Sequence, residues 1–317
     1  MKIHHTGIII LTIIGIIATG CSPSSSESAN NHNITIFTSI YPIQYAVEQI
    51  GGEEVNAKSI YPPGVDAHTY EPTSKEMTTI ADGDAFIYLG AGMEGFAEAA
   101  AAALDSQDVK MIELGANEEL FHVEKNHDEK NHKEESEHAE HNHGDVNPHI
   151  WLDPKRMIEM SGYIKDKLTE MNPENKQVYT QNFNALKKDL VALDNRFKET
   201  LQPKDYKEIL VSHAAYGYWE ERYGIEQIAI SGLSSSDEPS QKELTEIIDL
   251  AEEKKLDYVI FEQNGSDDVS KIIQDQIGAE ALYIHNLSVL NEEDMKNNAN
   301  YLSIMNKNLQ VLDKATK

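Results

Sequence analysis

The sequence predicts an α/β protein of two lobes, each a mostly parallel sheet flanked by helices, with one long rigid helix bridging them. Short apolar runs alternate with helical patterns in two separate blocks of the chain, as expected for parallel strands joined by crossover helices. A long helical pattern lies between the blocks. At 317 residues, the chain suits two lobes better than one.

The first lobe is expected over residues 34–171. Proline and glycine punctuate it, with Gly51 and Gly52 after the first helix and Pro62 and Pro63 after the second strand. The predicted elements, in order, are a strand at 34–38, a helix at 44–50, a strand at 55–61, a helix at 74–81 and a strand at 85–89.

The second lobe is expected over residues 203–317, where the same alternation returns. The predicted elements are a strand at 208–211, a helix at 243–253, a strand at 258–261, a helix at 269–276 and a strand at 281–284.

The linker helix is predicted over residues 172–202. Its apolar residues recur at steps of three and four from Tyr179 to Phe197, which is the spacing of one helix face. A helix over 174–201 would be roughly 42 Å long at about 1.5 Å per residue, long enough to brace two lobes. The alternative, a coiled-coil dimerisation helix, is disfavoured because the apolar stripe is short for strong pairing by itself. We therefore expect a monomer.

The N-terminus predicts export. Residues 1–20 form a secretory signal peptide in which Lys2 precedes an apolar run at 8–17, a run shorter than the roughly 20 residues of a membrane-spanning helix. Small residues lead into Cys21, the single cysteine, and this segment resembles a bacterial lipobox. The resemblance implies that Cys21 is lipidated and anchors the protein on the outer face of the cytoplasmic membrane, with residues 21–33 as a flexible tether. Ordinary signal cleavage, which would leave a free thiol, is the alternative.

The composition is strongly acidic, with a formal net charge of −27. Phosphate groups would repel such a chain, so nucleic acid is excluded as a partner, and adsorption to anionic lipid is disfavoured. The charge favours cations as ligands. Solubility of an exported protein accounts for the acidity equally well.

Residues 122–145 differ from both lobes, because they combine histidines with eight acids and three lysines and contain almost no apolar residues. Such a segment cannot bury enough surface to fold alone, so we expect a disordered loop. Its imidazoles predict weak metal capture near the site, with a solvated spacer as the alternative. They belong to His122, His127, His132, His138, His141 and His143.

Four other histidines lie just beyond an apolar strand or at the mouth of a helix: His68, His149, His213 and His285. The carboxyl ends of strands line the ligand crevice of open α/β sheets, so these positions converge on one place. Neutral imidazole suits Zn²⁺, whose sites hold three or four N, O or S ligands. Each histidine taken alone would more often be structural.

The whole chain, from the lipobox to Lys317, resembles the solute-binding proteins of bacterial zinc and manganese ABC importers. The motif around His68, the Asn-Pro-His-Ile-Trp-Leu-Asp-Pro run at His149 and the Ser-His-Ala-Ala-Tyr-Gly-Tyr run at His213 carry the resemblance. It implies that His68 and His149 from the first lobe and His213 from the second bind the metal. It also implies delivery to an ABC permease and, through it, to its ATPase.

Zinc is favoured over manganese, because manganese proteins of that family often have a carboxylate where this chain has His213, and three nitrogen ligands suit Zn²⁺ better. A manganese-binding homologue remains the alternative. The fourth ligand is open, since the segment with Ser288 lacks the acid that related proteins place near the last strand. Water, His285 and Glu262 are the candidates, and Glu262 could equally orient a ligand histidine from behind.

Two other classes of function compete with transport. A zinc enzyme is disfavoured, because the chain has no His-Glu-x-x-His motif and no companion base with a clear role. A metal-binding adhesin or an extracellular zinc buffer stays open.

Overall fold

The computed structural model describes residues 33–104, 106–121, 146–264 and 268–317. The predicted signal peptide, Cys21 and the six histidines between 122 and 145 lie outside these described residues. Within the described ranges, no helix combines the length and the apolarity that crossing a bilayer requires.

The first sheet has four parallel strands in the order β2-β1-β3-β4. Its strands are β1 (Ile34–Thr38), β2 (Val55–Ser59), β3 (Ala85–Tyr88) and β4 (Lys110–Glu113). Its helices are α1 (Tyr41–Gly51), α2 (Ser74–Ala81), α3 (Ala97–Leu104) and α4 (Pro154–Met171), with single 3₁₀ turns at Gly52–Glu54, Glu118–Leu120 and Ile150–Leu152. All four residues of β3 are buried, as expected for a strand covered on both faces.

The second sheet repeats this topology with four parallel strands in the order β6-β5-β7-β8. Its strands are β5 (Glu208–His213), β6 (Glu226–Ser231), β7 (Tyr258–Glu262) and β8 (Glu280–Ile284). Its helices are α6 (Gly217–Tyr223), α7 (Gln241–Lys254), α8 (Asp268–Ile277), α9 (Glu292–Lys296) and α10 (Tyr301–Ala315). In both sheets the strand order reverses beside the first strand, so the switch point where ligands bind lies between β1 and β3 and between β5 and β7.

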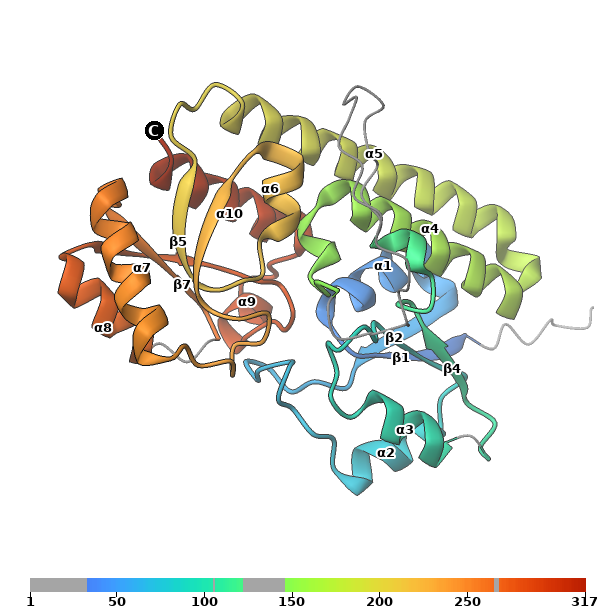
Figure 1. Ribbon diagram of the computed structural model, residues 1–317. Coiled ribbons are helices and arrows are strands. Elements are labelled where there is room, and N and C mark those ends of the chain that lie inside the picture. Colours follow the sequence, from blue (N-terminus) through green and yellow to red (C-terminus); the bar gives the residue numbers. More distant parts are fainter. Residues whose placement is uncertain (1–32, 105, 122–145, 265–267) are drawn as a thin grey trace, which may run out of the picture. The chain divides into compact units, whose positions relative to one another are not determined.

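The predicted α/β class and the bridging helix are confirmed. The helix α5 (Lys176–Leu201) follows a 3₁₀ turn at Pro173–Asn175 and contacts α1 and α4 of the first lobe and α6 and α10 of the second. Figure 1 shows it running alongside helices of both lobes. The predicted apolar stripe is its buried face, apart from Phe183, which is half-buried. Because helices of both lobes pack on α5, it joins them as a brace.

One continuous apolar core extends through both lobes and the bridging helix. It includes Phe86 of β3, Trp151 before α4, Tyr179 of α5, Trp219 of α6 and Tyr301 of α10, all almost fully buried. A smaller cluster fills the space between the second sheet and α7 and α8. Since separating the lobes would expose part of the larger core, the link between them is stiffer than a free hinge.

Several elements were not predicted from the sequence. The edge strands β4, of four residues, and β6, of six, are only partly buried, so their apolar signal is weak. The helix α6 has seven residues and α9 has five, which is close to two turns or fewer and gives little periodicity to detect. The helix α4 begins at Pro154, with Asp153 as N-cap, and the Asp153 side chain accepts from the Lys155 backbone N–H.

A buried charge network ties α5 to the second lobe. Arg222 of α6 donates two hydrogen bonds to Asp194 of α5, at 2.9 and 2.7 Å. Lys198 donates to the same carboxylate at 2.8 Å, and the Tyr223 hydroxyl donates to it at 3.1 Å. Burial alone would raise the pKa of Asp194, but the hydrogen bonds from Arg222 and Lys198 hold it below its ordinary value. Asp194 is therefore a charged anchor between the helix and α6.

We expect the Asp194→Asn variant to lose about 2–3 kcal/mol of unfolding free energy at neutral pH, because Arg222 keeps its charge but loses its nearer ionic partner and retains only Asp153 at 3.7 Å. The folded-state pKa of Asp194 is depressed, so its contribution is present above the unfolded value of about 3.9 and is lost as pH falls through the folded value. Urea unfolding at pH 7 and below pH 4 measures this. Asp189→Asn, at an exposed position of the same helix, is the control. An equal effect of the two substitutions at pH 7 would contradict the assignment.

Candidate metal centre

Three histidines from distant parts of the chain meet at one point, and their ligand atoms all lie within 4.8 Å of one another. The Nε2 atoms of His68 and His149 are 3.2 Å apart, and those of His213 and His149 are 3.3 Å apart. Two nitrogens bound to a tetrahedral zinc ion at about 2.0–2.1 Å each would lie about 3.3–3.4 Å apart. The observed spacing therefore fits a single ion held by three Nε2 atoms.

His68 lies in the loop after β2 and is half-buried. Its backbone N–H donates to Oδ1 of Asp66 at 2.8 Å, and the Thr69 N–H donates to the same oxygen at 3.3 Å. This is an Asx turn, in which an aspartate side chain fixes the backbone two residues later. The Tyr61 hydroxyl donates to the Ala67 carbonyl at 3.1 Å and so stabilises the turn.

His149 lies on the turn that leads into α4 and is 1% exposed. Oδ1 of Asn147 accepts from its backbone N–H at 3.0 Å and lies 2.8 Å from its Nδ1. Because the Asn147 atom already acts as an acceptor, Nδ1 of His149 must carry the proton. Nε2 then presents its lone pair to the metal.

His213 is the last residue of β5, and Glu262 is the last residue of β7. The register that pairs Val211 with Ile260 continues to place these two residues side by side. Nδ1 of His213 lies 2.7 Å from Oε1 of Glu262. The carboxylate therefore orients the imidazole so that Nε2 faces the other histidines.

Both carboxylate oxygens of Glu262 have hydrogen-bond partners. The Tyr216 hydroxyl donates to its Oε1 at 2.7 Å, and Nδ2 of Asn286 donates to its Oε2 at 2.6 Å. Burial alone would raise the pKa of Glu262, but His213 and these hydrogen bonds hold it below its ordinary value. Two roles were predicted for Glu262, as fourth ligand or as the partner that orients a ligand histidine, and this arrangement fits the second role.

The three imidazoles differ in proton affinity. Burial and the neighbouring imidazoles lower the pKa of His149 well below its ordinary value, and burial followed by His213 lowers the pKa of His68. Burial would also lower the pKa of His213, but Glu262 reverses this and raises it. A metal ion must therefore displace a proton chiefly from His213.

His285 lies apart from this group. It follows β8, where its Nδ1 accepts from the Leu287 N–H at 2.8 Å and its Nε2 lies 3.0 Å from Oδ2 of Asp294. Both ring nitrogens thus hold the turn that leads into α9. The Ser288 hydroxyl donates to Asn286 Oδ1 at 2.8 Å. Among the residues that the structure describes, the group of potential ligands contains the three histidines alone.

Aromatic side chains of the second lobe fix the segment that carries His149. Nε1 of Trp219 donates to the Leu152 carbonyl at 2.7 Å, and the Tyr218 hydroxyl donates to the Asn147 carbonyl at 2.6 Å. Nε1 of Trp151 in turn donates to the Asn286 carbonyl at 2.7 Å. These bonds preorganise the distance between the ligands of the two lobes.

The sequence reasoning missed the residues that position the ligands. Asp66 and Asn147 each stand two residues before a ligand histidine and accept its backbone N–H. That repeated Asx-x-His spacing is visible in the sequence and is a usable signal. Tyr216 and Asn286 gave no such signal, because only the tertiary fold brings them to Glu262.

A contact between the lobes also lies beside the ligands. The Ser235 hydroxyl, in the loop after β6, donates to Oδ2 of Asp66. We expect Ser235→Ala to speed metal release several-fold, because Asp66 would then hold His68 without its anchor in the second lobe. Stopped-flow transfer of zinc to a chromophoric chelator measures the rate. Ser236→Ala, which removes a hydroxyl bonded to Ser234 in the same loop, is the control, and equal rates for both variants would refute the contact's role.

Known proteins resemble this chain in sequence and in structure. The family model described as "Zinc-uptake complex component A periplasmic" (ZnuA) matches residues 36–315. The zinc-binding lipoprotein AdcA of Streptococcus pneumoniae is 30% identical over 292 residues, which cover 92% of this chain and 58% of that relative. The chain thus spans little more than half the length of this relative.

Two further comparisons cover whole chains. The high-affinity zinc uptake system protein ZnuA of Bacillus subtilis is 27% identical over 310 residues, covering 97% of this chain and 96% of that protein. The crystal structure of the Zn(II)-bound ZnuA-like domain of Streptococcus pneumoniae AdcA superposes with a TM-score of 0.72 at 30% identity, covering 90% of this chain and 99% of that domain.

Proposed function

We propose a function from the premise that this chain belongs to the zinc-uptake complex component A family: it captures one Zn²⁺ outside the cytoplasm and delivers it to an ABC permease for import. The observation that carries the proposal is the group of three histidines whose ligand atoms lie within 4.8 Å of one another, with Nε2 of His149 at tetrahedral spacing from those of His68 and His213. The opposite ring nitrogens of His149 and His213 are held by Asn147 and Glu262. Such outer partners are what metal-binding imidazoles need to keep their orientation.

Zinc is the proposed cargo, and water its proposed fourth ligand. Three imidazole nitrogens form a borderline-soft set that suits Zn²⁺ better than Mn²⁺. His285 and Glu262, the protein candidates for the fourth position, are engaged with Asp294 and with His213 respectively. A tetrahedral site with three protein ligands leaves one place for a water molecule.

Transport rather than catalysis is proposed for this centre. An open coordination position also occurs in zinc enzymes, where a nearby base must activate the bound water. Within the described ranges, the carboxylate in contact with a ligand imidazole is that of Glu262, which is turned to Nδ1 of His213 and accepts from Tyr216 and Asn286. It is therefore not placed as a free base.

Membrane attachment belongs to the same proposal. The signal peptide and Cys21 predict a lipid anchor, and a relative carries the name lipoprotein. A tethered binding protein stays close to its permease, which raises the effective concentration of the partner. Palmitate labelling of the full chain and of Cys21→Ala in a bacterial host tests the anchor, and label that persists in the variant would overturn it.

The function is tested by competition between metals. We expect native mass spectrometry of the protein with equimolar Zn²⁺ and Mn²⁺ to show one tightly held zinc ion per chain and no manganese, because three nitrogen ligands follow the Irving–Williams order. Calorimetry then gives the stoichiometry of each metal alone. Preferential retention of manganese would refute zinc as the cargo.

A further inference from the structure

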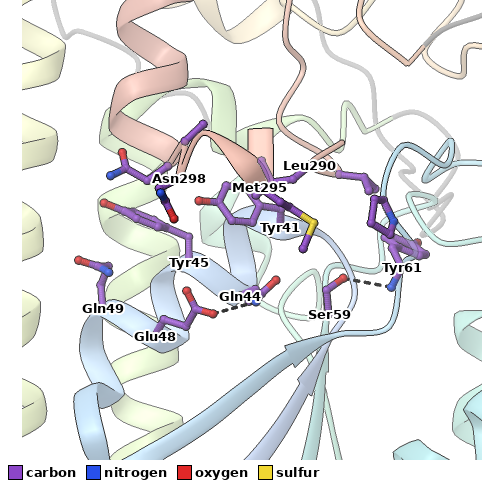
Figure 2. A pocket seen from close by; sticks show the side chains of 14 residues that line it. Tyr41, Gln44, Tyr45, Glu48, Gln49, Ser59, Tyr61, Leu290, Met295 and Asn298 are labelled. Carbon is purple, nitrogen blue, oxygen red and sulfur yellow. Dashed lines mark hydrogen bonds between the residues drawn. The ribbon is translucent and has the colours of Figure 1, made fainter. Parts of the chain in front are cut away.

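A second pocket, of about 520 Å³, lies where α1 and the end of β2 meet the segment from Val289 to Asn300 (Figure 2). None of the three ligand histidines lines it. Its wall on the first lobe comes from α1 and includes Tyr41, Gln44, Tyr45 and Glu48. Its opposite wall includes Met295 of α9. The pocket is therefore separate from the metal centre.

The backbones of the two lobes join at the edge of this pocket. The Tyr41 N–H donates to the Ser288 carbonyl at 2.8 Å, and the Gly64 N–H donates to the Leu290 carbonyl at 3.0 Å. A molecule in the pocket would touch both lobes at once. Its binding would thus favour the arrangement in which these two contacts are made.

The charge of the pocket selects its ligand. Among the described residues that line it, Glu48 is the one that carries a charge, and none of them is a lysine, arginine or histidine. Nε2 of Gln44 donates to Oε1 of Glu48 at 2.8 Å, a bond that Figure 2 shows. Partial burial of its carboxyl group raises the pKa of Glu48 although the side chain is exposed at the mouth of the pocket, and the described lining residues supply no cation to offset this rise. The pocket therefore disfavours anions and leaves a carboxylate short of a positive partner.

Aromatic rings stand on the same helix face as this carboxylate. Tyr41, Tyr45 and Glu48 are four and three residues apart, so they project from one side of α1. The rings of Tyr41 and Tyr45 have centroids 6.1 Å apart, and Tyr45 stacks on Tyr301 at 5.5 Å. Tyr41 and Tyr45 are 7% and 4% exposed, so only a small part of each ring faces the pocket, where it can contact an aliphatic stem.

Met295 adds an exposed apolar side chain to the lining of the pocket. Met295 is 57% exposed and faces the α1 wall; Figure 2 shows its thioether above Gln44 and beside Tyr41. Methionine adapts to flexible aliphatic partners. The pocket thus offers a carboxylate, aromatic rings and a flexible apolar contact within one cavity.

We propose that this pocket binds an aliphatic organic cation. An ammonium or guanidinium group donates hydrogen bonds to Glu48, and its aliphatic stem lies against Tyr41, Tyr45 and Met295. A free polyamine and a lysine or arginine side chain of a partner protein share this chemistry. Phosphates, carboxylates and nucleotides are excluded by the same charge.

The test is calorimetric titration of the full, zinc-free chain with spermidine and, in a second arm, with a blocked tripeptide that carries one central lysine. One saturable site is expected for at least one probe, and the tighter probe identifies the source of the cation. Glu48→Gln keeps the acceptor for Gln44 but removes the charge, so it should weaken binding at least tenfold. The matched control is Glu159→Gln, at an exposed position of α4, which should leave binding unchanged.

The outcomes are separable from those of the metal site. Zinc affinity should be the same in Glu48→Gln and in the wild-type protein, because Glu48 lines the second pocket and is absent from the histidine group. Failure of both probes to saturate, or equal binding to the Glu48→Gln and wild-type proteins, would overturn the proposal. Met295→Ala should weaken binding several-fold through loss of the apolar contact, and an unchanged affinity there would exclude the stem contact.

Discussion

The His213→Ala protein is expected to bind zinc about 10²–10³-fold more weakly than the wild-type protein. Structural zinc sites are worth roughly 10–16 kcal/mol, so a quarter share per ligand is about 2.5–4 kcal/mol. His213 is the proposed ligand of the second lobe, and its Nε2 lies 3.3 Å from that of His149. Losing it leaves two ligands on one lobe and an uncompensated Glu262. Competition with a chelator of known affinity measures the zinc affinity of both proteins.

The matched control for this experiment is His285→Ala. His213 ends a strand of the second sheet and His285 directly follows another, but the ring nitrogens of His285 bond Leu287 and Asp294. Its removal should cost fold stability and leave zinc affinity within a few-fold of the wild-type value. A loss as large as that of His213→Ala would make His285 the fourth ligand and contradict the water-completed site. Thermal unfolding of both variants without metal separates folding effects from binding.

The Glu262→Gln protein is expected to bind zinc about 10–100-fold more weakly, which is the usual cost of losing an outer partner of a metal-binding histidine. The carboxylate accepts from His213, Tyr216 and Asn286 together, and a neutral amide cannot satisfy all three donors. Tyr216→Phe is the control, since it removes one of these bonds but keeps the ionic pair. A larger effect of Tyr216→Phe than of Glu262→Gln would contradict the positioning role of the charge.

The same variant has a distinctive pH dependence. Glu262 raises the pKa of His213 above its ordinary value of about 6.5, so in the wild-type protein protons compete with zinc as pH falls through that raised value. In Glu262→Gln the competition should begin at lower pH. The sign for the metal-free protein follows from linkage, because the stability due to a raised histidine pKa is present below about 6.5 and is lost as pH rises through the folded value. Zinc titrations and thermal unfolding between pH 5.5 and 8.5 test both.

The sequence alone determined much of the fold, because its strongest signals are local. The apolar stripe from Tyr179 to Phe197 predicts α5 through helix periodicity. The buried runs at β3, β5 and β7 predict central strands, since these lie covered on both faces. The edge strands β4 and β6 escaped prediction because partial exposure dilutes the apolar pattern.

The contacts of the metal site could be predicted only in part from the local sequence. Strand ends gather at one edge of a parallel sheet, so the sequence placed His213, Glu262 and His285 together as candidates. Only the pairing of β5 with β7 across the switch point sets Glu262 against His213. The strand β8 lies at the edge of its sheet, and His285, which follows it, contacts Asp294 instead of joining the other three histidines.

The sequence by itself therefore determined that this is a two-lobed α/β protein with histidines at the ends of its strands, because periodicity and residue type are properties of neighbouring residues. The tertiary structure decided which histidine nitrogens meet, which carboxylate stands behind them and where the lobes enclose a second pocket. Those choices depend on strand order and on contacts such as the bond from Tyr41 to Ser288, which join residues hundreds of positions apart. No local pattern carries that information.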